Sequence, residues 1–268
     1  MTASVSDGIS STKLARLEFR VFRRFKEQLA GKHLLVACSG GRDSVALVEI
    51  LSRLQSRCGF TFAIAYVNHG FSSDLKVSRY RQKAARFVQR LAKAHAVDFV
   101  LLAKDSKTEL KSEAEMREFR HRLLRQAQRH LRCTHVVFAH HADDLFETRL
   151  LRLIRGTGAF GLRAMQDIED DLMRPLLHES ANEIQEYVNS LGIRFLNDPS
   201  NRDTRYLRNW LRHKWLSQLE ARQPGGVQAL KRSLEMIASD VVDTSATTEN
   251  DKKASTFDRI RFESSSLA

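Results

Sequence analysis

Four short apolar runs alternate with amphipathic segments through the first 155 residues, and this alternation constrains the fold more than any other feature. The runs are HLLVAC (33–38), FTFAIAYV (60–67), VDFVLLA (97–103) and THVVFAH (134–140), each of a length typical of a buried strand. The segments at 45–54, 74–94, 111–131 and 143–154 have helical spacing. The pattern predicts an α/β fold with a parallel sheet and helices on both faces. Ligands of such sheets bind beyond the carboxyl ends of the strands.

The rest of the chain predicts additions to this sheet. Residues 12–29 predict a first helix, and a small helical extension follows the sheet. After 155 we expect a glycine-rich loop, a short strand in DLMRPLL, a helix that ends near Gly192, and a basic aromatic helix in YLRNWLRHKWLSQLE. The segment QPGG (223–226) breaks the chain before a short helix (227–238) and a polar stretch predicted to be disordered. We therefore divide the chain into an N-terminal helix (1–30), an α/β domain (31–222) and a short helix with a tail (223–268).

Charge and composition limit the classes of function. The chain has 44 Lys and Arg against 32 Asp and Glu, and its formal net charge of +12 favours a polyanionic partner such as RNA. No run approaches the roughly 20 apolar residues of a membrane span, and the start has no apolar signal segment. The cysteines Cys38, Cys58 and Cys133 form no CxxC pair. We therefore expect a cytoplasmic protein without a membrane partner, a disulfide framework or a zinc ribbon.

The sharpest motif lies between the first strand and its helix. It consists of Ser39, Gly40, Gly41, Arg42, Asp43 and Ser44. The glycines let phosphate approach the backbone amides, and the helix N-terminus adds free N–H groups. Asp43 would repel phosphate unless a cation bridged them, so the motif predicts a nucleotide phosphate bound with Mg²⁺. The chain has no Walker loop. An ordinary strand–turn–helix connection is the alternative interpretation.

This loop resembles the SGGxDS loop of the ATP pyrophosphatase, or PP-loop, superfamily, whose fold is adenine nucleotide alpha hydrolase-like. Seven further segments, in order, are similar to motifs of the tRNA(Ile)-lysidine synthetase family. They are VNHG (67–70), EAEMREFR (113–120), HHADDLFET (140–148), RGTGAFGL (155–162), RPLL (174–177), DPSN (198–201) and RNWLR (208–212). Asn68, Leu145 and His121 stand where the family has aspartate, glutamine and tyrosine. The resemblance is to a short form, because 48 residues follow position 220 where the family usually carries a tRNA-binding domain.

The resemblance implies a two-step reaction on the wobble cytidine of a tRNA(Ile) with a CAU anticodon. The C2 oxygen of the cytosine attacks the α-phosphorus of ATP, and pyrophosphate leaves. The ε-amine of free L-lysine then attacks C2, and AMP leaves. ATP and Mg²⁺ are the implied cofactors, tRNA(Ile) and lysine are the implied substrates, and a homodimer is left open.

Candidate site residues follow from the motifs together with the resemblance. The loop residues 39–44 and His69 are assigned to ATP, and Asp43 to Mg²⁺ through the phosphates. Asp144 and Glu147 share one face of a helix just after His140, where carboxylates can hold the lysine amine or deprotonate it. The lysine site is assigned to Arg120, His140, Asp144 and Glu147. The catalytic set is Asp43, Arg120, Asp144 and Glu147.

A basic set with interleaved aromatic residues is assigned to tRNA phosphates. Its arginines are Arg155, Arg174, Arg205, Arg208 and Arg212. Simpler readings remain open: acidic residues favour the start of any helix, the HH-DD cluster could bind a metal, Asp143 could be a cap, and His69 could be a buried structural residue. Two other functions also remain open, a tRNA thiolase on the same loop and a degenerate homologue that binds RNA or nucleotide without turnover.

Overall fold

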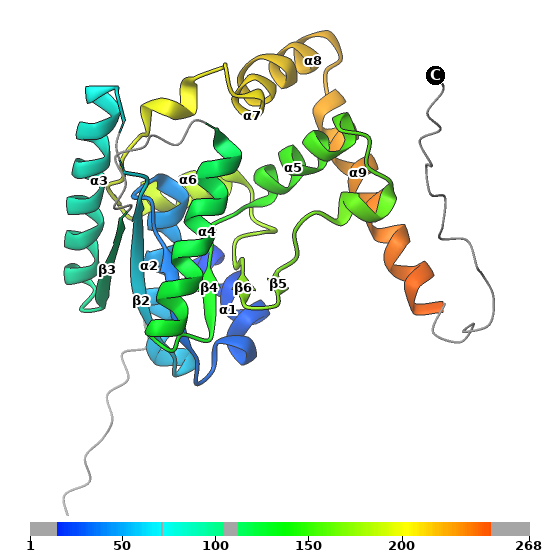
Figure 1. Ribbon diagram of the computed structural model, residues 1–268. Coiled ribbons are helices and arrows are strands. Elements are labelled where there is room, and N and C mark those ends of the chain that lie inside the picture. The colour runs from blue at the N-terminus through cyan, green and yellow to red at the C-terminus, as the bar shows by residue number, and fades with distance from the viewer. Residues whose placement is uncertain (1–14, 71, 104–111, 248–268) are drawn as a thin grey trace, which may run out of the picture.

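A six-stranded sheet forms the centre of the molecule. The computed structural model describes residues 15–70, 72–103 and 112–247 (Figure 1). The strands are β1 (His33–Ala37), β2 (Thr61–Asn68), β3 (Asp98–Ala103), β4 (His135–Val137), β5 (Ile168–Glu169) and β6 (Leu172–Met173). Their order is β3-β2-β1-β4-β6-β5, with every neighbouring pair parallel except β5 and β6. The predicted parallel sheet is confirmed. The sequence does not predict strand β5, because two residues are too few to show the alternation of apolar and polar side chains that marks a strand.

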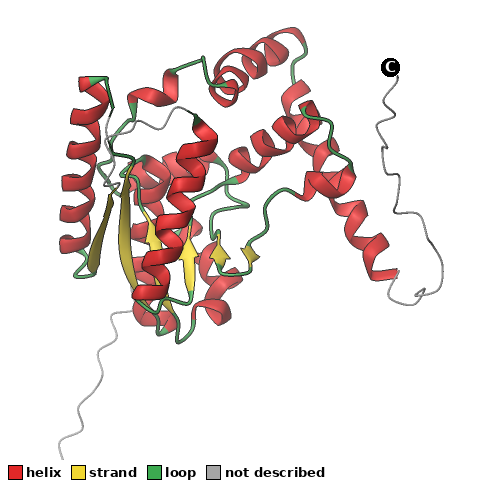
Figure 2. Cartoon of the chain, viewed as in Figure 1, coloured by secondary structure: helices red, strands yellow, loops and turns green. Residues whose placement is uncertain are grey.

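Helices cover both faces of the sheet, as the alternation predicted (Figure 2). Successive β1 residues point to opposite faces, so Leu34 and Val36 join one core and Leu35 the other. The first core also contains residues of α1 (Arg16–Leu29), α2 (Arg42–Cys58), α3 (Leu75–Ala94) and α6 (Ala181–Ser190). The second core is covered by α4 (Glu113–His130). The carboxyl ends of β1, β2 and β4 therefore meet at one edge, where the loops that carry the motifs begin.

A helical extension packs on α5 (Ala142–Ile154), to the side of the sheet (Figure 1). It consists of α7 (Leu207–Trp210), a π-helical turn η3 (Leu211–Trp215), α8 (Leu216–Arg222) and α9 (Gly226–Thr247). The short 3₁₀ turns are η1 (Ala159–Arg163) and η2 (Pro199–Arg202). A small core of Phe146, Leu150, Leu162, Leu234 and Ala238 joins α5, η1 and α9. This packing fixes the extension against the helix that carries the predicted acidic residues.

Several predicted boundaries differ from the structure. Helix α9 continues to Thr247, nine residues past its expected end, so 239–247 are helical rather than disordered; residues 248–268 lie outside the described part. Strand β4 ends at Val137, so residues 138–141 form the connection into α5. The single helix expected around 206–220 is interrupted by the π turn η3. The sequence could not predict this interruption, because a π turn leaves no trace in hydrophobic periodicity. Within the described residues, no helix is long and apolar enough to cross a membrane.

Candidate active site

The loop formed by residues 39–44, called the phosphate loop below, has the conformation that its glycines predict. Gly40 has a φ of +82°, and a Cβ there would lie 3.3 Å from Phe87 Cδ1 and 3.4 Å from Val88 Cγ2. The Leu196 N–H donates to the Gly40 carbonyl at 2.8 Å, which ties the loop to the segment after α6. Gly41 is the N-cap of α2 and offers no side chain to cap it. The first amides of α2 are therefore available to an anion.

Hydroxyl groups brace this loop from within. The Gly41 N–H donates to Ser39 Oγ at 3.3 Å, and Ser39 Oγ lies 3.2 Å from Ser44 Oγ. Ser44 Oγ donates to the Gly41 carbonyl at 2.9 Å and is buried. Beneath them lies Cys38, a thiol whose pKa is raised by burial. The two serines thus hold the turn in a fixed shape, and Ser39 lies nearer the surface.

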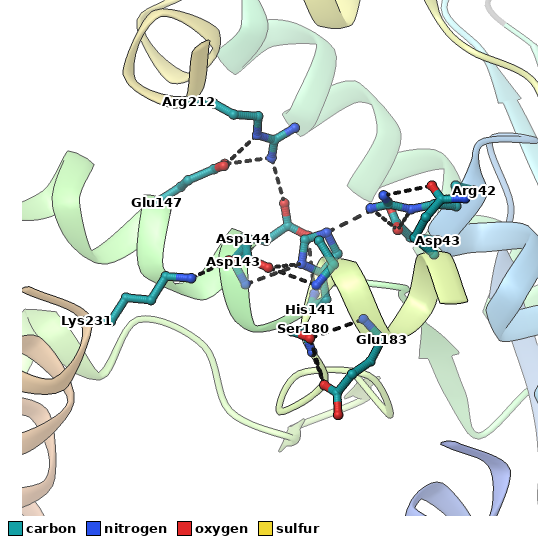
Figure 3. A network of polar contacts seen from close by, with 12 residues as sticks. Arg42, Asp43, His141, Asp143, Asp144, Glu147, Ser180, Glu183, Arg212 and Lys231 are labelled. Atoms are coloured by element: carbon teal, nitrogen blue, oxygen red, sulfur yellow. Dashed lines mark hydrogen bonds and ion pairs between the residues drawn. The ribbon is translucent and has the colours of Figure 1, made fainter. Parts of the chain in front are cut away.

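Asp43 lies at the start of α2 and faces the start of α5. Its Oδ1 accepts from Arg42 Nε at 2.7 Å, and its Oδ2 lies 3.8 Å from His141 Nε2 (Figure 3). Arg42 also reaches Gln185 on α6 at 3.4 Å. Mg²⁺ in nucleotide sites is commonly held by one or two carboxylates together with substrate phosphates. Asp43 fits that role because it belongs to the loop itself and its carboxylate lies at the first turn of α2.

His141, to which the sequence pattern assigns no role, joins the loop to α5. It is only 4% exposed and is the N-cap of α5, where its Nδ1 accepts from the Asp143 N–H at 3.3 Å. A neutral ring therefore carries its proton on Nε2, which lies 3.4 Å from Asp144 Oδ2. In Figure 3, His141 stands between Asp43 and the carboxylates of α5. A histidine directly before an acidic helix start was the signal available in the sequence.

The predicted lysine-binding carboxylates are together and already paired. Glu147 is 2% exposed and receives a fork from Arg212, Nε to Oε1 at 2.6 Å and Nη2 to Oε2 at 2.8 Å. Arg212 Nη2 also reaches Asp144 Oδ1 at 3.3 Å. Burial raises the pKa of Glu147 in spite of the Arg212 hydrogen bonds. Arg208 donates to Thr148 Oγ1 at 2.6 Å, and its Nε lies 3.6 Å from Glu147 Oε2.

Asp143 is held by the extension. Lys231 on α9 donates to Asp143 Oδ1 at 2.5 Å, and the Ala181 N–H donates to Oδ2 at 2.9 Å. Burial opposes ionisation of Asp143, but these two hydrogen bonds outweigh it and hold its pKa below the usual range. Lys231 also lies over the Phe146 ring, 5.3 Å from its centroid. Asp143 therefore links α5 to α6 and α9, a role that the sequence could not reveal because Lys231 is 88 positions away.

Three imidazoles gather around Arg120 at the carboxyl ends of β2 and β4. Burial lowers the pKa of His69 and of His121 to about 4 and that of His140 to about 3, and the charge of Arg120 adds to each effect. His121 and His140 each lie 5.3 Å from the Phe138 ring. Each histidine has one buried ring nitrogen without a hydrogen-bond partner: Nδ1 of His69, Nε2 of His121 and Nδ1 of His140. These neutral rings can accept or donate to a polar ligand.

The five arginines predicted for tRNA do not form one surface. Arg174 is 4% exposed, donates to the Gln166 carbonyl at 2.8 Å and pairs with Glu169, so burial withdraws it from phosphate in this structure. Arg208 and Arg212 face α5. Arg155 is exposed at the end of α5, and Arg205 is exposed and paired with Asp203.

Among the described residues, no group of three or more His, Cys, Asp or Glu side chains is arranged to hold a metal ion.

Comparisons with known proteins agree with the motifs. A family model described as PP-loop domain matches residues 15–219. The chain is similar to the tRNA(Ile)-lysidine synthase of Bdellovibrio bacteriovorus, 41% identical over 226 residues, which are 84% of this chain and 69% of that protein. It is 36% identical to the same enzyme of Geobacter sulfurreducens over 220 residues, 78% of this chain and 45% of that protein. The chain spans about half the length of most of the relatives it matches.

A solved structure has a similar fold. The U34-tRNA thiolase NcsA from Methanococcus maripaludis, described with its [4Fe-4S] cluster, superimposes with a TM-score of 0.66. The sequences are 14% identical, and the match covers 83% of this chain and 78% of that one. At this identity the likeness concerns the fold alone.

Proposed function

Because this chain belongs to the tRNA(Ile)-lysidine synthase family of PP-loop proteins, we propose that it adenylates the wobble cytidine of a tRNA(Ile) and then replaces AMP by lysine. One observation carries the proposal. The phosphate loop and the α5 carboxylates share one site at the carboxyl edge of the sheet, with His141 between Asp43 and Asp144 (Figure 3). A ligase of this kind needs its nucleotide and its amine substrate close together.

The phosphate loop would bind the pyrophosphate end of ATP. The amides of the first turn of α2 would donate to phosphate oxygens, and the helix dipole favours the phosphate charge. Mg²⁺ held by Asp43 would neutralise charge that develops on the leaving pyrophosphate. Ser39 offers its hydroxyl to a phosphate oxygen, while Ser44 stays with the Gly41 carbonyl.

Arg120 is proposed to act on the α-phosphate. The three histidines around it carry no charge near pH 7, so the positive charge near them comes from Arg120 and from neighbouring arginines such as Arg117 and Arg174. A guanidinium aimed at the α-phosphate stabilises the negative charge that builds up as the cytosine oxygen attacks. The unpartnered nitrogens of His69 and His140 can hydrogen-bond the nucleotide or the base.

The lysine amine is proposed to bind at Asp144. Arg212 holds Glu147 with two short hydrogen bonds but reaches Asp144 only at 3.3 Å. A lysine ammonium can therefore take the place of Arg212 at Asp144 while the fork on Glu147 remains. The amine must lose a proton before it attacks C2. The pKa of Glu147, raised by burial, suits that carboxylate to accept the proton once one of the two Arg212 hydrogen bonds is released. Arg212 would then be a positioning residue.

The test separates the two half-reactions. We expect Asp144→Asn and Glu147→Gln to impair lysine use more than adenylation, since their charge is assigned to the amine. Adenylated tRNA would be accumulated without lysine, and its decay would be followed after lysine is added. Asp203→Asn is the control, because the Asp203 carboxylate pairs with the exposed Arg205 rather than with a residue of α5. Equal losses in both steps would reject the assignment to lysine.

The thiolase alternative gains no support from the cysteines. All three are free, and Cys38 and Cys133 lie in the cores on opposite faces of the sheet. Cys58 ends α2, at the end of that helix remote from the phosphate loop. This placement gives a cysteine-held cluster no common site, whereas the phosphate loop and α5 meet directly.

A further inference from the structure

Helix α3 carries a stripe of positive charge that the proposed reaction does not use. We call it the α3 stripe. It consists of Lys76, Arg79, Lys83, Arg86, Arg90 and Lys93, all exposed. Their spacing alternates between three and four residues, which places all six on one side of a helix. The opposite side carries Ala84, Val88 and Ala92, which are buried in the core beside the sheet.

The stripe is long, regular and connected to the site. Lys93 lies 17 positions after Lys76, which corresponds to about 25 Å along a helix and about 5 Å between successive cations. Helix α3 begins at Leu75, soon after β2 ends at Asn68, so its first turn lies at the carboxyl edge of the sheet. From there α3 runs down the outer flank of the molecule beside β3 (Figure 1). A single strand of phosphates that leaves the site could follow the same line.

The stripe is unfavourable for the helix that carries it. Like charges three and four residues apart repel each other, and Lys76 stands at the helix end where the dipole disfavours a cation. Leu75–Ala94 contains no Asp or Glu to offset them. Within the described part of the chain, no ion pair involves any of the six residues. The same holds for some cations of α1, but that helix also contains Glu18 and Glu27. The uncompensated charge fits an external polyanion.

We propose that the α3 stripe is a docking surface for the sugar-phosphate backbone of the RNA substrate, outside the catalytic site. This rests on the proposed function for the identity of the RNA. It also supplies the phosphate contacts that the predicted arginines leave open, because Arg174 is buried and Arg208 and Arg212 face α5. The contacts position the RNA and do not read its sequence.

The test compares two variants that lose the same charge. One is Arg79→Gln/Lys83→Gln/Arg86→Gln on α3, and its matched control is Arg16→Gln/Arg23→Gln/Lys26→Gln on α1. The control residues are also exposed and have no ion pair among the contacts of the described residues. Both triple variants lower the net charge by three, so a difference between them reports position rather than total charge.

The readout is tRNA affinity titrated over salt, from about 50 to 200 mM. Each phosphate contact contributes about 0.7–0.9 to the slope of log affinity against log salt, so three lost contacts should flatten it by about two units. We expect the α3 variant to bind tRNA about 10- to 100-fold more weakly at the low end, and the α1 variant to stay within about twofold. The α3 variant should melt no lower than the parent, because repulsion is relieved.

Equal changes in both variants would overturn the proposal, since they would show only the effect of net charge. Unchanged slope and affinity in the α3 variant would overturn it too. Vesicles containing phosphatidylserine provide a second arm: if the α3 variant loses vesicle binding but keeps tRNA binding, the stripe is a membrane surface instead. Binding is read without turnover, so a chain that failed to form lysidine would disprove the proposed reaction and leave this result standing.

Discussion

Replacing Arg212 by alanine should destabilise the folded protein through the carboxylate that it leaves behind. Glu147 is 2% exposed and receives two hydrogen bonds from Arg212, at 2.6 and 2.8 Å. Removing one partner of a fully buried ion pair costs about 3–5 kcal/mol. The Arg212 side chain is 37% exposed, so water screens part of the interaction, and we expect about 2 kcal/mol. The assay is the free energy of unfolding from urea denaturation at neutral pH.

The pH dependence of stability provides a second test of this prediction. Burial raises the pKa of Glu147 above its usual 4.5, so the folded state holds that proton more tightly than the unfolded chain does. Stability from this group is present at low pH and declines as the pH rises through the folded pKa. Without Arg212 that pKa rises further. The deficit of Arg212→Ala should therefore be larger at about pH 8 than at about pH 5.

Two controls separate the buried charge from other effects. Arg212→Ala/Glu147→Gln removes the carboxylate that Arg212→Ala leaves without its guanidinium, so it should recover most of the stability lost by Arg212→Ala alone. Arg205→Ala removes a guanidinium from the exposed pair with Asp203 and should leave the unfolding free energy unchanged. If the single and double variants of Arg212 were equally unstable, or if the deficit did not vary with pH, the reasoning about Glu147 would be refuted.

Three further predictions concern the loop and the histidines. Gly40→Ala should cost about 1–2 kcal/mol of stability and weaken ATP binding, because a Cβ at a φ of +82° would crowd Phe87 and Val88; ATP titration and denaturation measure both. Asp43→Asn should abolish pyrophosphate release at saturating ATP and Mg²⁺ without unfolding the protein, and near-normal release would contradict its role. Because the pKa of His121 is lowered to about 4, the free energy of unfolding should fall as the pH drops from about 6.5 towards 4. His121→Phe should make that fall smaller, as denaturation curves at several pH values would measure.

The residue pattern alone determined the architecture and the local shape of the site. Apolar runs flanked by helical segments predicted the parallel sheet, because side-chain periodicity depends on neighbouring residues only. The two glycines before Asp43 predicted a tight loop, because glycine readily adopts a positive φ and Gly40 has one. This property too belongs to the residues themselves. The spacing of Asp144 and Glu147 placed them on one face of α5, as the structure has them.

Only the tertiary structure decided which charges meet. Arg212 pairs with Glu147 across 65 positions and Lys231 with Asp143 across 88, so no local pattern could have paired them. These contacts depend on how η3 and α9 lie against α5, through a small core that forms only when the elements are already in place. The same packing turned predicted RNA-facing arginines inward. Periodicity follows from short-range geometry, whereas the partner of a charge follows from the fold as a whole.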